Sequence, residues 1–327
     1  MGILVLNEKE IRRCIALDQE VLRAVAHGFI RLSEGAATVP PIMMIPIPER
    51  TGEVDVKAAY IQGLDGLAVK IASGFFENQR LHLPSSSGLM VVLSAITGFP
   101  EAVLLDNGYL TQVRTGAAGA IAAQFLAPKK VEVVGVAGAG VQARFQILAL
   151  KLVRDFQAVM VYGRRAEQVE SYRREMAPRL GVPITAARSL EQLVGGCSVL
   201  VTTTPAREPL IQPHWLHPGL HITAMGADTE EKQELHPGVL QRAELIACDL
   251  KSQCLRLGEL HHALASGALS QRREILELGE LCSGKKAGRQ NEEQISVCDL
   301  TGVGVQDTEI ALLALARAKS QGLGLSV

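Results

Sequence analysis

The sequence lacks the features that mark membrane, nucleic-acid-binding and metal-binding proteins. No uninterrupted apolar run approaches the ~20 residues that a membrane-spanning helix needs. Lys plus Arg (33) nearly equal Asp plus Glu (34), so the net charge of −1 gives no electrostatic reason to expect nucleic acid or an anionic membrane as partner. The six cysteines include no C-x-x-C pair, and none stands beside a histidine at metal-ligand spacing. We therefore predict no metal site.

The cysteines and the first residues indicate a cytoplasmic protein. Scattered thiols in a chain of 327 residues are typical of a reducing compartment. The apolar run in MGILVLNEKEIRRC is too short for a signal peptide, and its charges come after it. With 47% hydrophobic and 20% charged residues, the composition suits a soluble globular enzyme. The chain is long for one compact domain, so we expect two.

The stretch around Gly138 is the strongest motif. It fits G-x-G-x-x-A, and it stands between an apolar run and a periodic apolar segment without Gly or Pro. Gly138 would permit a tight turn, Gly140 a close approach of a pyrophosphate, and Ala143 close packing of the following helix on the sheet. The free N–H groups and the dipole of that helix would make an anion site. The motif predicts dinucleotide binding at Gly138, Ala139, Gly140, Val141 and Gln142.

The first third of the chain predicts helices followed by a mostly antiparallel sheet. Val21, Val25 and Phe29 recur at helical spacing, whereas four prolines make a later passage extended. Strand-like runs follow, and the last of them turns back at Thr97-Gly98 as a hairpin. In order, the elements are one or two helices in residues 8–34, edge strands or loops in 39–53, strands in 54–63, 66–76 and 88–106, and a helix in 111–127.

From Lys130 onward strands and helices alternate, which is typical of a doubly wound parallel sheet. The fold class is therefore α/β, with a Rossmann domain in the second half of the chain. Residues 307–321 predict an amphipathic helix that could return to the first domain. The strands are residues 131–138, 158–163, 183–188, 198–204, 221–226, 244–249 and 295–300, and the helices between them are 142–154, 167–179 and 189–195.

The segment after the second strand of this sheet bears on the choice of cofactor. NAD enzymes usually carry an acidic residue about 20 positions after the glycines, where it binds the ribose hydroxyls. Residues 161–165 hold no carboxylate. The guanidinium groups of Arg164 and Arg165 could receive a 2′-phosphate, or the segment is a solvated basic turn. We expect an NAD(P)(H) cofactor and favour NADP slightly.

Three cations of the first domain are candidate anion ligands. Lys70 and Lys57 both have apolar neighbours in their strands. A lysine in such a strand either snorkels at the sheet edge or, as we weigh for Lys70, lines a cleft and serves as anion ligand or acid/base group. Arg114 can hold a carboxylate bidentately, or it is a surface arginine near a helix start.

Asp228 is the candidate catalytic residue of the second domain. It follows a predicted strand and a turn of small residues. Ligands of open α/β sheets bind beyond the carboxyl ends of strands, so Asp228 is in the right place for catalysis. Alternatively, its side chain caps the N-terminus of a following helix, and the two roles are compatible.

Together these residues resemble the ornithine cyclodeaminase/mu-crystallin family over nearly the whole chain. The resemblance rests on the stretch from VKIASGFF to AAQFLA, on VGVAGAGVQA, on GADTEEKQEL and on VCDLTGVGVQDTEIA, in this order and spacing. It implies an α/β substrate-binding and dimerisation domain in residues 1–127 and 306–327. It further implies a Rossmann dinucleotide-binding domain in residues 128–305, and a homodimer.

The resemblance also implies roles for single residues. Lys70 and Arg114 match the carboxylate-binding lysine and arginine of the family, and Asp228 matches its catalytic aspartate. The family commonly has another carboxylate-binding arginine where this sequence has Met44. Lys57 stands where many members have an uncharged or acidic residue. The positions implied to contact the cofactor are Thr203, Thr204, Thr301 and Gly302.

Within the family, GEVDVK, GLDG and LLDNGYLT are similar to the branch associated with ectoine utilisation and iminosuccinate reduction. Substrates there can carry a second carboxylate, for which Lys57 would be a counter-ion. We expect an NAD(P)H-dependent imine reductase or amino-acid dehydrogenase that acts on a small 2-imino or 2-oxo acid. In it, Lys70 and Arg114 would hold the α-carboxylate, and Asp228 would exchange a proton with the nitrogen.

Two alternatives remain open from the sequence. One is a cyclodeaminase of the ornithine or lysine type with bound NAD. The other, of a different class, is an NADPH-dependent binding protein for a small ligand, like mu-crystallin. In each case the expected partner is a small molecule.

Overall fold

The computed structural model describes residues 2–327, which divide into two compact units. The first unit contains the chain up to Arg114 together with Val303–Val327, and the second contains Thr115–Gly302. Helix α3 (Tyr109–Leu126) begins in the first unit and ends in the second. The expected division of the chain into domains at residues 127 and 306 stays a prediction.

The first unit is built on one sheet in the order β16-β1-β7-β6-β5-β4-β2, with β3 also paired to β4. All neighbours are antiparallel except β1 and β7, so the predicted antiparallel character is confirmed. Gly98 has a positive φ in the turn between β6 and β7, where the hairpin was expected. The strands are β1 (Leu4–Asn7), β2 (Ala37–Thr38), β3 (Met43–Ile47), β4 (Gly52–Ile61), β5 (Gly66–Phe75), β6 (Ser86–Ser94), β7 (Pro100–Leu105) and β16 (Leu325–Ser326).

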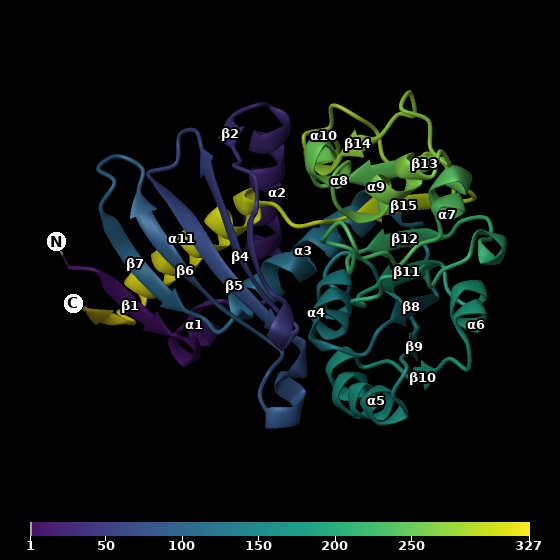
Figure 1. Ribbon diagram of the computed structural model, residues 1–327, viewed down its shortest axis with the longest axis horizontal. Helices are drawn as coiled ribbons and strands as arrows, with labels where there is room; N and C mark the ends of the chain where they lie inside the picture. Colours follow the sequence, from purple (N-terminus) through teal and green to yellow (C-terminus); the bar gives the residue numbers. More distant parts are fainter. Residues whose placement is uncertain (1) are drawn as a thin grey trace. The chain divides into compact units, whose positions relative to one another are not determined.

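Helices α1 (Glu8–Cys14), α2 (Gln19–Ser33) and α11 (Gly304–Ser320) belong to this unit. The side chain of Asp18 accepts a hydrogen bond from the Val21 N–H and so caps α2. The chain turns at Gly35, whose φ is +71°. Figure 1 shows α11 running along the sheet, where it packs against β4, β5 and α2.

The opposite face of this sheet is apolar and only partly buried. Strand register places alternate residues on it, away from the face that α11 covers. Tyr60 and Ile71 are each 37% exposed on this face, and Leu105 is 45% exposed. Half-buried neighbours on the same face are Val54, Val56, Val69, Leu89, Val91 and Val103.

The second unit is a fully parallel sheet in the order β10-β9-β8-β11-β12-β15-β13-β14. Its strands are β8 (Val133–Ala137), β9 (Ala158–Tyr162), β10 (Ile184–Ala186), β11 (Val199–Thr202), β12 (His221–Ala224), β13 (Leu245–Cys248), β14 (Leu276–Glu277) and β15 (Ser296–Asp299). Its helices are α4 (Val141–Leu150), α5 (Ala166–Leu180), α6 (Leu190–Gly195), α7 (Pro237–Arg242), α8 (Lys251–Cys254), α9 (Gly258–Ala265) and α10 (Leu278–Cys282).

Alternate residues of the central strands pack into two different cores. Val199 of β11 belongs to a core that includes side chains of α4 and α5. Leu200, the next residue, belongs to a core that includes side chains of α6, α7 and α9. Both faces of the sheet are therefore covered by helices, as a parallel sheet requires. The predicted fold class, a doubly wound Rossmann sheet plus an α/β unit, is confirmed.

The part of α3 that lies in the second unit packs closely on α4. A Cβ at Gly116 would lie 2.9 Å from the carbonyl oxygen of Phe145, and one at Gly119 would overlap the side chain of Gln146. Glycine at these positions lets the two helices approach. No described helix combines the length and the hydropathy that crossing a bilayer demands.

We expect Gly116→Ala to lower the melting temperature of the protein. The added methyl group meets a backbone atom that cannot rotate away, and overpacking of this kind costs about 1–3 kcal/mol. Gly195→Ala is the control, because a Cβ there meets nothing within 4 Å. Alanine is the better helix former by roughly 0.5–1 kcal/mol, so the control should melt at the same or a higher temperature. Equal melting temperatures of the two variants would contradict the close packing of α3 on α4.

Candidate active site

The glycine turn follows β8, where the strand order of the second sheet reverses. From β8 the chain continues to β9 and β10 on one side of it. The next strand, β11, lies on the other side of β8. Ligands of open α/β sheets bind beyond such a switch point. Gly138 has a φ of +112°, and a Cβ there would lie 2.6 Å from Thr203 Oγ1. Both the backbone and the neighbouring strand end therefore require glycine.

The N-terminus of α4 offers open space and N–H groups without a side-chain cap. Gly140 is the N-cap residue, and it has no side chain that could cap the helix. Apart from its chain neighbours, no described atom lies within 4 Å of the place that a Cβ at Gly140 would occupy. The helix dipole favours an anion at this end. Ala139, Val141 and Gln142 belong to the same turn, and the arrangement fits the pyrophosphate of a dinucleotide.

Arg144 fixes this turn through hydrogen bonds, although it is not part of the glycine pattern. Its Nη1 donates to the carbonyl oxygens of Ala139 (2.7 Å) and Gly140 (3.0 Å). Its Nε donates to Glu175 at 2.7 Å, and its Cζ lies 5.3 Å from the centroid of the Tyr172 ring. The carbonyl groups of the turn are thereby satisfied within the protein.

The two arginines of the cofactor prediction follow β9, beside the glycine turn. A Cβ at Gly163 would lie 3.5 Å from the Cβ of Ala139, so the end of β9 lies close to the turn. Arg164 and Arg165 are exposed, and Arg165 is the N-cap residue of α5. The end of β9 carries two exposed cations.

The other cofactor positions lie at the same edge of the sheet. β8, β11, β12 and β15 are parallel neighbours in this order, so their carboxyl ends meet at one edge. Thr203 and Thr204 follow β11, whereas Thr301 and Gly302 follow β15. The Asp249 carboxylate accepts from Thr301 Oγ1 at 3.1 Å and from the Gly302 N–H at 2.6 Å. The structure thus brings these four positions to the edge that bears the glycine turn.

Asp228 follows β12 at this edge and lies in a loop. Residues 225–236 contain no helix, since α7 begins at Pro237. The alternative that Asp228 caps a helix is therefore wrong. Its Oδ1 lies 2.7 Å from Nζ of Lys232, and its side chain is 40% exposed. Asp228 is thus an accessible carboxylate that Lys232 holds in place.

The first unit buries Lys57 and Lys70 next to each other. They are directly opposite in the register of β4 and β5, so their side chains share one face of the sheet. Lys57 is 8% exposed and Lys70 is 2% exposed. Neither strand is at the edge of the sheet, because β5 lies between β4 and β6, and β4 between β5 and β2. Snorkelling at the sheet edge is therefore wrong for both lysines.

Arg114 is buried in α3 and binds the start of α11. It is 4% exposed, so the alternative of a surface arginine is wrong. Its Nε donates to Asp307 Oδ1 at 2.9 Å, and its Nη1 donates to Gln306 Oε1 at 2.6 Å. Lys70 Nζ lies 3.3 Å from Asp307 Oδ2. One fully buried carboxylate thus pairs with both Lys70 and Arg114.

Known proteins match this chain over its full length. The model of the ornithine cyclodeaminase/mu-crystallin family matches residues 3–322. The chain belongs to this family. The iminosuccinate reductase of Paracoccus denitrificans (strain Pd 1222) is 32% identical to this member and covers 99% of each chain.

Two solved structures of relatives hold a nicotinamide cofactor. Delta(1)-pyrroline-2-carboxylate reductase from Thermococcus litoralis, in complex with NADH and L-proline, superposes with a TM-score of 0.94 at 29% identity and covers 99% of this chain and 100% of its own. An archaeal alanine dehydrogenase dimer with bound NAD superposes with a TM-score of 0.92 at 33% identity and covers 100% of this chain and 99% of its own. These members of the family are oxidoreductases of imino and amino acids.

Inside the first unit of this family member, burial and neighbouring charges shift the pKa values of Lys70, Asp307 and Asp106. Burial lowers the pKa of Lys70 to about 7, and Arg114 contributes further while Asp307 opposes. Burial also acts to raise the pKa of Asp307, but Arg114, Lys70 and Lys57 outweigh it and hold that pKa below its usual range. Burial raises the pKa of Asp106, another carboxylate within reach of Lys70, to about 6. An additional anion would therefore be stabilised among these cations.

Sequence reasoning missed Gln306 and Asp307. A signal was present, because Gln306, Asp307 and Thr308 are consecutive polar residues near the start of α11. The structure buries all three. Met44, at the position of the additional family arginine, is 40% exposed on β3 and pairs with Asp55 of β4. The structure accordingly has no cation at position 44.

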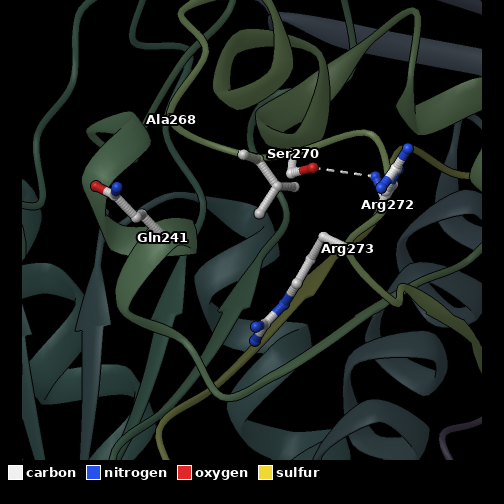
Figure 2. Close-up of a pocket in the computed structure, with 6 residues that line it drawn as sticks. Gln241, Ala268, Ser270, Arg272 and Arg273 are labelled. Atoms are coloured by element: carbon white, nitrogen blue, oxygen red, sulfur yellow. Dashed lines mark hydrogen bonds between the residues drawn. The ribbon is translucent and has the colours of Figure 1, made fainter.

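Figure 2 shows a hollow of the second unit that contains none of the predicted site residues. The Arg273 guanidinium next to it is engaged by the carbonyl oxygen of Glu244 at 2.8 Å. Throughout residues 2–327, no group of three or more His, Cys, Asp or Glu side chains could hold a metal ion. The residues that line the hollow are Gln241, Ala268, Leu269, Ser270, Arg272 and Arg273.

We expect Asp307→Asn to destabilise the protein strongly. It leaves Lys70 and Arg114 buried without their shared anion, and breaking a buried ion pair from one side costs about 3–5 kcal/mol. The measurement is the free energy of unfolding in urea at neutral pH. Glu101→Gln is the control, since it breaks an exposed pair with Lys319 that is worth about 1 kcal/mol at most. Similar losses for both variants would contradict the role of Asp307.

Proposed function

We propose that this protein is an NAD(P)H-dependent imine reductase or amino-acid dehydrogenase that acts on a small 2-imino or 2-oxo acid. The observation that carries the proposal is the buried group of Lys57, Lys70 and Arg114, in which Lys70 and Arg114 share the carboxylate of Asp307. A soluble anion such as a carboxylate is the ligand that this group suits. The glycine turn of the second unit adds the dinucleotide.

The residues would divide the reaction among them. Lys70 and Arg114 would bind the α-carboxylate and orient the imine carbon. When bound, the reduced nicotinamide supplies the hydride. Asp228 would exchange a proton with the substrate nitrogen and stabilise its positive charge. Positioning and electrostatics from these side chains would contribute most of the rate enhancement that the protein itself makes.

The cofactor would occupy the glycine turn and the neighbouring strand ends. The turn at Gly138 and the positions after β11 and β15 would bind it, and Arg144 would keep the turn in place. Arg164 and Arg165 are exposed beside the turn, so they could receive a 2′-phosphate. We therefore keep NADP slightly ahead of NAD, although both structures named above hold the unphosphorylated cofactor.

The direct experiment follows oxidation of NADH and NADPH with a panel of 2-oxo acids plus ammonia, cyclic ketimines and iminosuccinate. Turnover of at least one of them supports the proposal, and the better cofactor decides the phosphate preference. Ammonia release from ornithine or lysine without net change in NADH would select a cyclodeaminase instead. Tight binding of a small ligand without hydride transfer would select a mu-crystallin-like binding protein.

The pH should control binding of the carboxylate through Lys70. Since its pKa lies at about 7, the ammonium form exists below this pH and is lost above it. The dissociation constant of a 2-oxo acid, measured without ammonia, should therefore rise as the pH increases through 7. In Lys70→Met, binding should be weaker and this rise should disappear. The same rise in the variant would assign the titration to another group.

Lys57 would select substrates with a second carboxylate. It lies on the same face of the sheet as Lys70, and Met44 lies on that face too, opposite Asp55. We expect Lys57→Ala to lower kcat/KM for iminosuccinate by about tenfold to a hundredfold, the value of a hydrogen bond to a charged group. Monocarboxylate substrates should be nearly unaffected, whereas Lys70→Ala should impair both classes. Equal losses on both classes in Lys57→Ala would remove the case for this lysine.

We further propose a homodimer formed through the apolar face of the first unit's sheet that α11 does not cover. A partly exposed apolar face of this kind is typical of an interface, and one relative named above is a dimer. Light scattering should give twice the mass of one chain. Ile71→Lys on this face should yield monomers, whereas Ile96→Lys, in the β6–β7 turn and 74% exposed, should leave the mass unchanged. A monomeric wild type would exclude the dimer.

A further inference from the structure

Glu234 joins two strand ends of the second unit through one buried carboxylate. It is 0% exposed. Its Oε1 accepts from the Thr204 N–H at 2.6 Å, which fixes the segment after β11. Its Oε2 accepts from Thr202 Oγ1 at 2.6 Å and from the Gly226 N–H at 2.8 Å. Both oxygens are thus engaged, and the donors come from the ends of both β11 and β12.

The absence of a side chain at Gly226 makes room for this carboxylate. A Cβ at Gly226 would lie 2.6 Å from Glu234 Oε2 and closer still to the carbonyl oxygen of Thr204. No residue other than glycine fits there while the carboxylate stays in place. The position of the Glu234 carboxylate therefore requires glycine at position 226. Asp228 lies two residues further along the same loop.

Glu234 is itself held by a second buried carboxylate. Glu259 accepts from the Glu234 N–H at 2.7 Å and from the Leu235 N–H at 3.1 Å. The carbonyl oxygen of Glu234 accepts from the N–H groups of Leu210 (2.7 Å) and Ile211 (3.0 Å). With its backbone fixed on both sides, the carboxylate cannot follow a loop that moves. It therefore acts as a fixed tie between the strand ends.

We infer that Glu234 is a positioning residue, which holds the Asp228 loop in register with the threonines after β11. The inference rests on the proposed function, in which Asp228 exchanges the proton and Thr203 and Thr204 bind the cofactor. Glu234 touches neither a substrate nor a cofactor in this role. It acts through Gly226 and Thr204.

Glu234→Gln is the informative variant because an amide can satisfy only one of the two loops. A glutamine has one acceptor oxygen and one NH2 group, whereas Thr204 and Gly226 both present an N–H. Whichever way the amide is oriented, one of these N–H groups faces another donor. The volume of the side chain is nearly unchanged. Glu234→Gln therefore removes the tie without leaving a cavity.

Glu259→Gln is the matched control. The two glutamates are both buried carboxylates that accept N–H bonds, but Glu259 binds residues 234–235 and not the strand ends. In the protein without cofactor, hydrogen exchange should rise in peptides containing Thr204 or Gly226 in Glu234→Gln. In Glu259→Gln, the rise should be largest in peptides around residue 235 and smaller at Thr204 and Gly226 than in Glu234→Gln.

The loaded enzyme gives an independent readout. In Glu234→Gln, we expect NADH to bind at the wild-type stoichiometry with a higher dissociation constant. We expect kcat to fall about tenfold to a hundredfold. The KM of the carboxylate substrate should change little, because Lys70 and Arg114 are untouched. The deuterium isotope effect with 4-deuterated NADH should increase, since misplacement slows the hydride step. A variant that only loses folded protein would show fewer NADH sites and an unchanged isotope effect.

Unchanged exchange at Thr204 and Gly226 together with wild-type kcat and isotope effect would overturn the inference. A larger kinetic loss in Glu259→Gln than in Glu234→Gln would also overturn it, because Glu259 reaches the strand ends only through Glu234. If the wild type binds NADH but turns over nothing, the proposed function fails. The exchange and NADH affinities would still decide whether Glu234 ties the two loops.

Discussion

Two buried ion pairs of Asp307 join β5, α3 and α11, which lie far apart in the sequence. Lys70 and Arg114 are almost fully buried and share this carboxylate, which stands in the first turn of α11. Losing one partner of such a pair costs about 3–5 kcal/mol, a large share of the roughly 5–15 kcal/mol that stabilises a folded domain. These ion pairs join the last helix of the chain to the first unit. The return of this helix makes the first unit discontinuous in sequence and places cations around one anion.

The two units differ in the sign of the charged side chains that they bury near the candidate site residues. The first unit buries three cations, of which Lys70 and Arg114 share the carboxylate of Asp307. The second unit binds backbone N–H groups with buried carboxylates, as Glu234 does for Gly226 and Asp249 does for Gly302. Burial raises the pKa of Glu234 above its usual range although its hydrogen bonds oppose this. These carboxylates shape loops, and they leave the N-terminus of α4 as the place for an anion.

The parts of the fold and site that depend on local sequence could be predicted. The glycine turn rests on backbone conformation, and Lys70 stood out because a charge inside an apolar strand needs a reason. Asp307 and Glu234 could not be found in this way. Arg114 and Asp307 are 193 residues apart, and Thr202 and Glu234 are 32 apart. Their roles come from long-range packing that no periodicity or spacing encodes.

In the proposed reaction, hydride passes from a nicotinamide cofactor to the α-carbon of an imino acid. The most direct test supplies the wild-type protein with 4-deuterated NADH or NADPH and a 2-imino acid, and locates the deuterium in the product by mass spectrometry and NMR. We expect one deuterium at the α-carbon of the amino acid that forms. Tight binding of cofactor and acid with no deuterium in any product would contradict it.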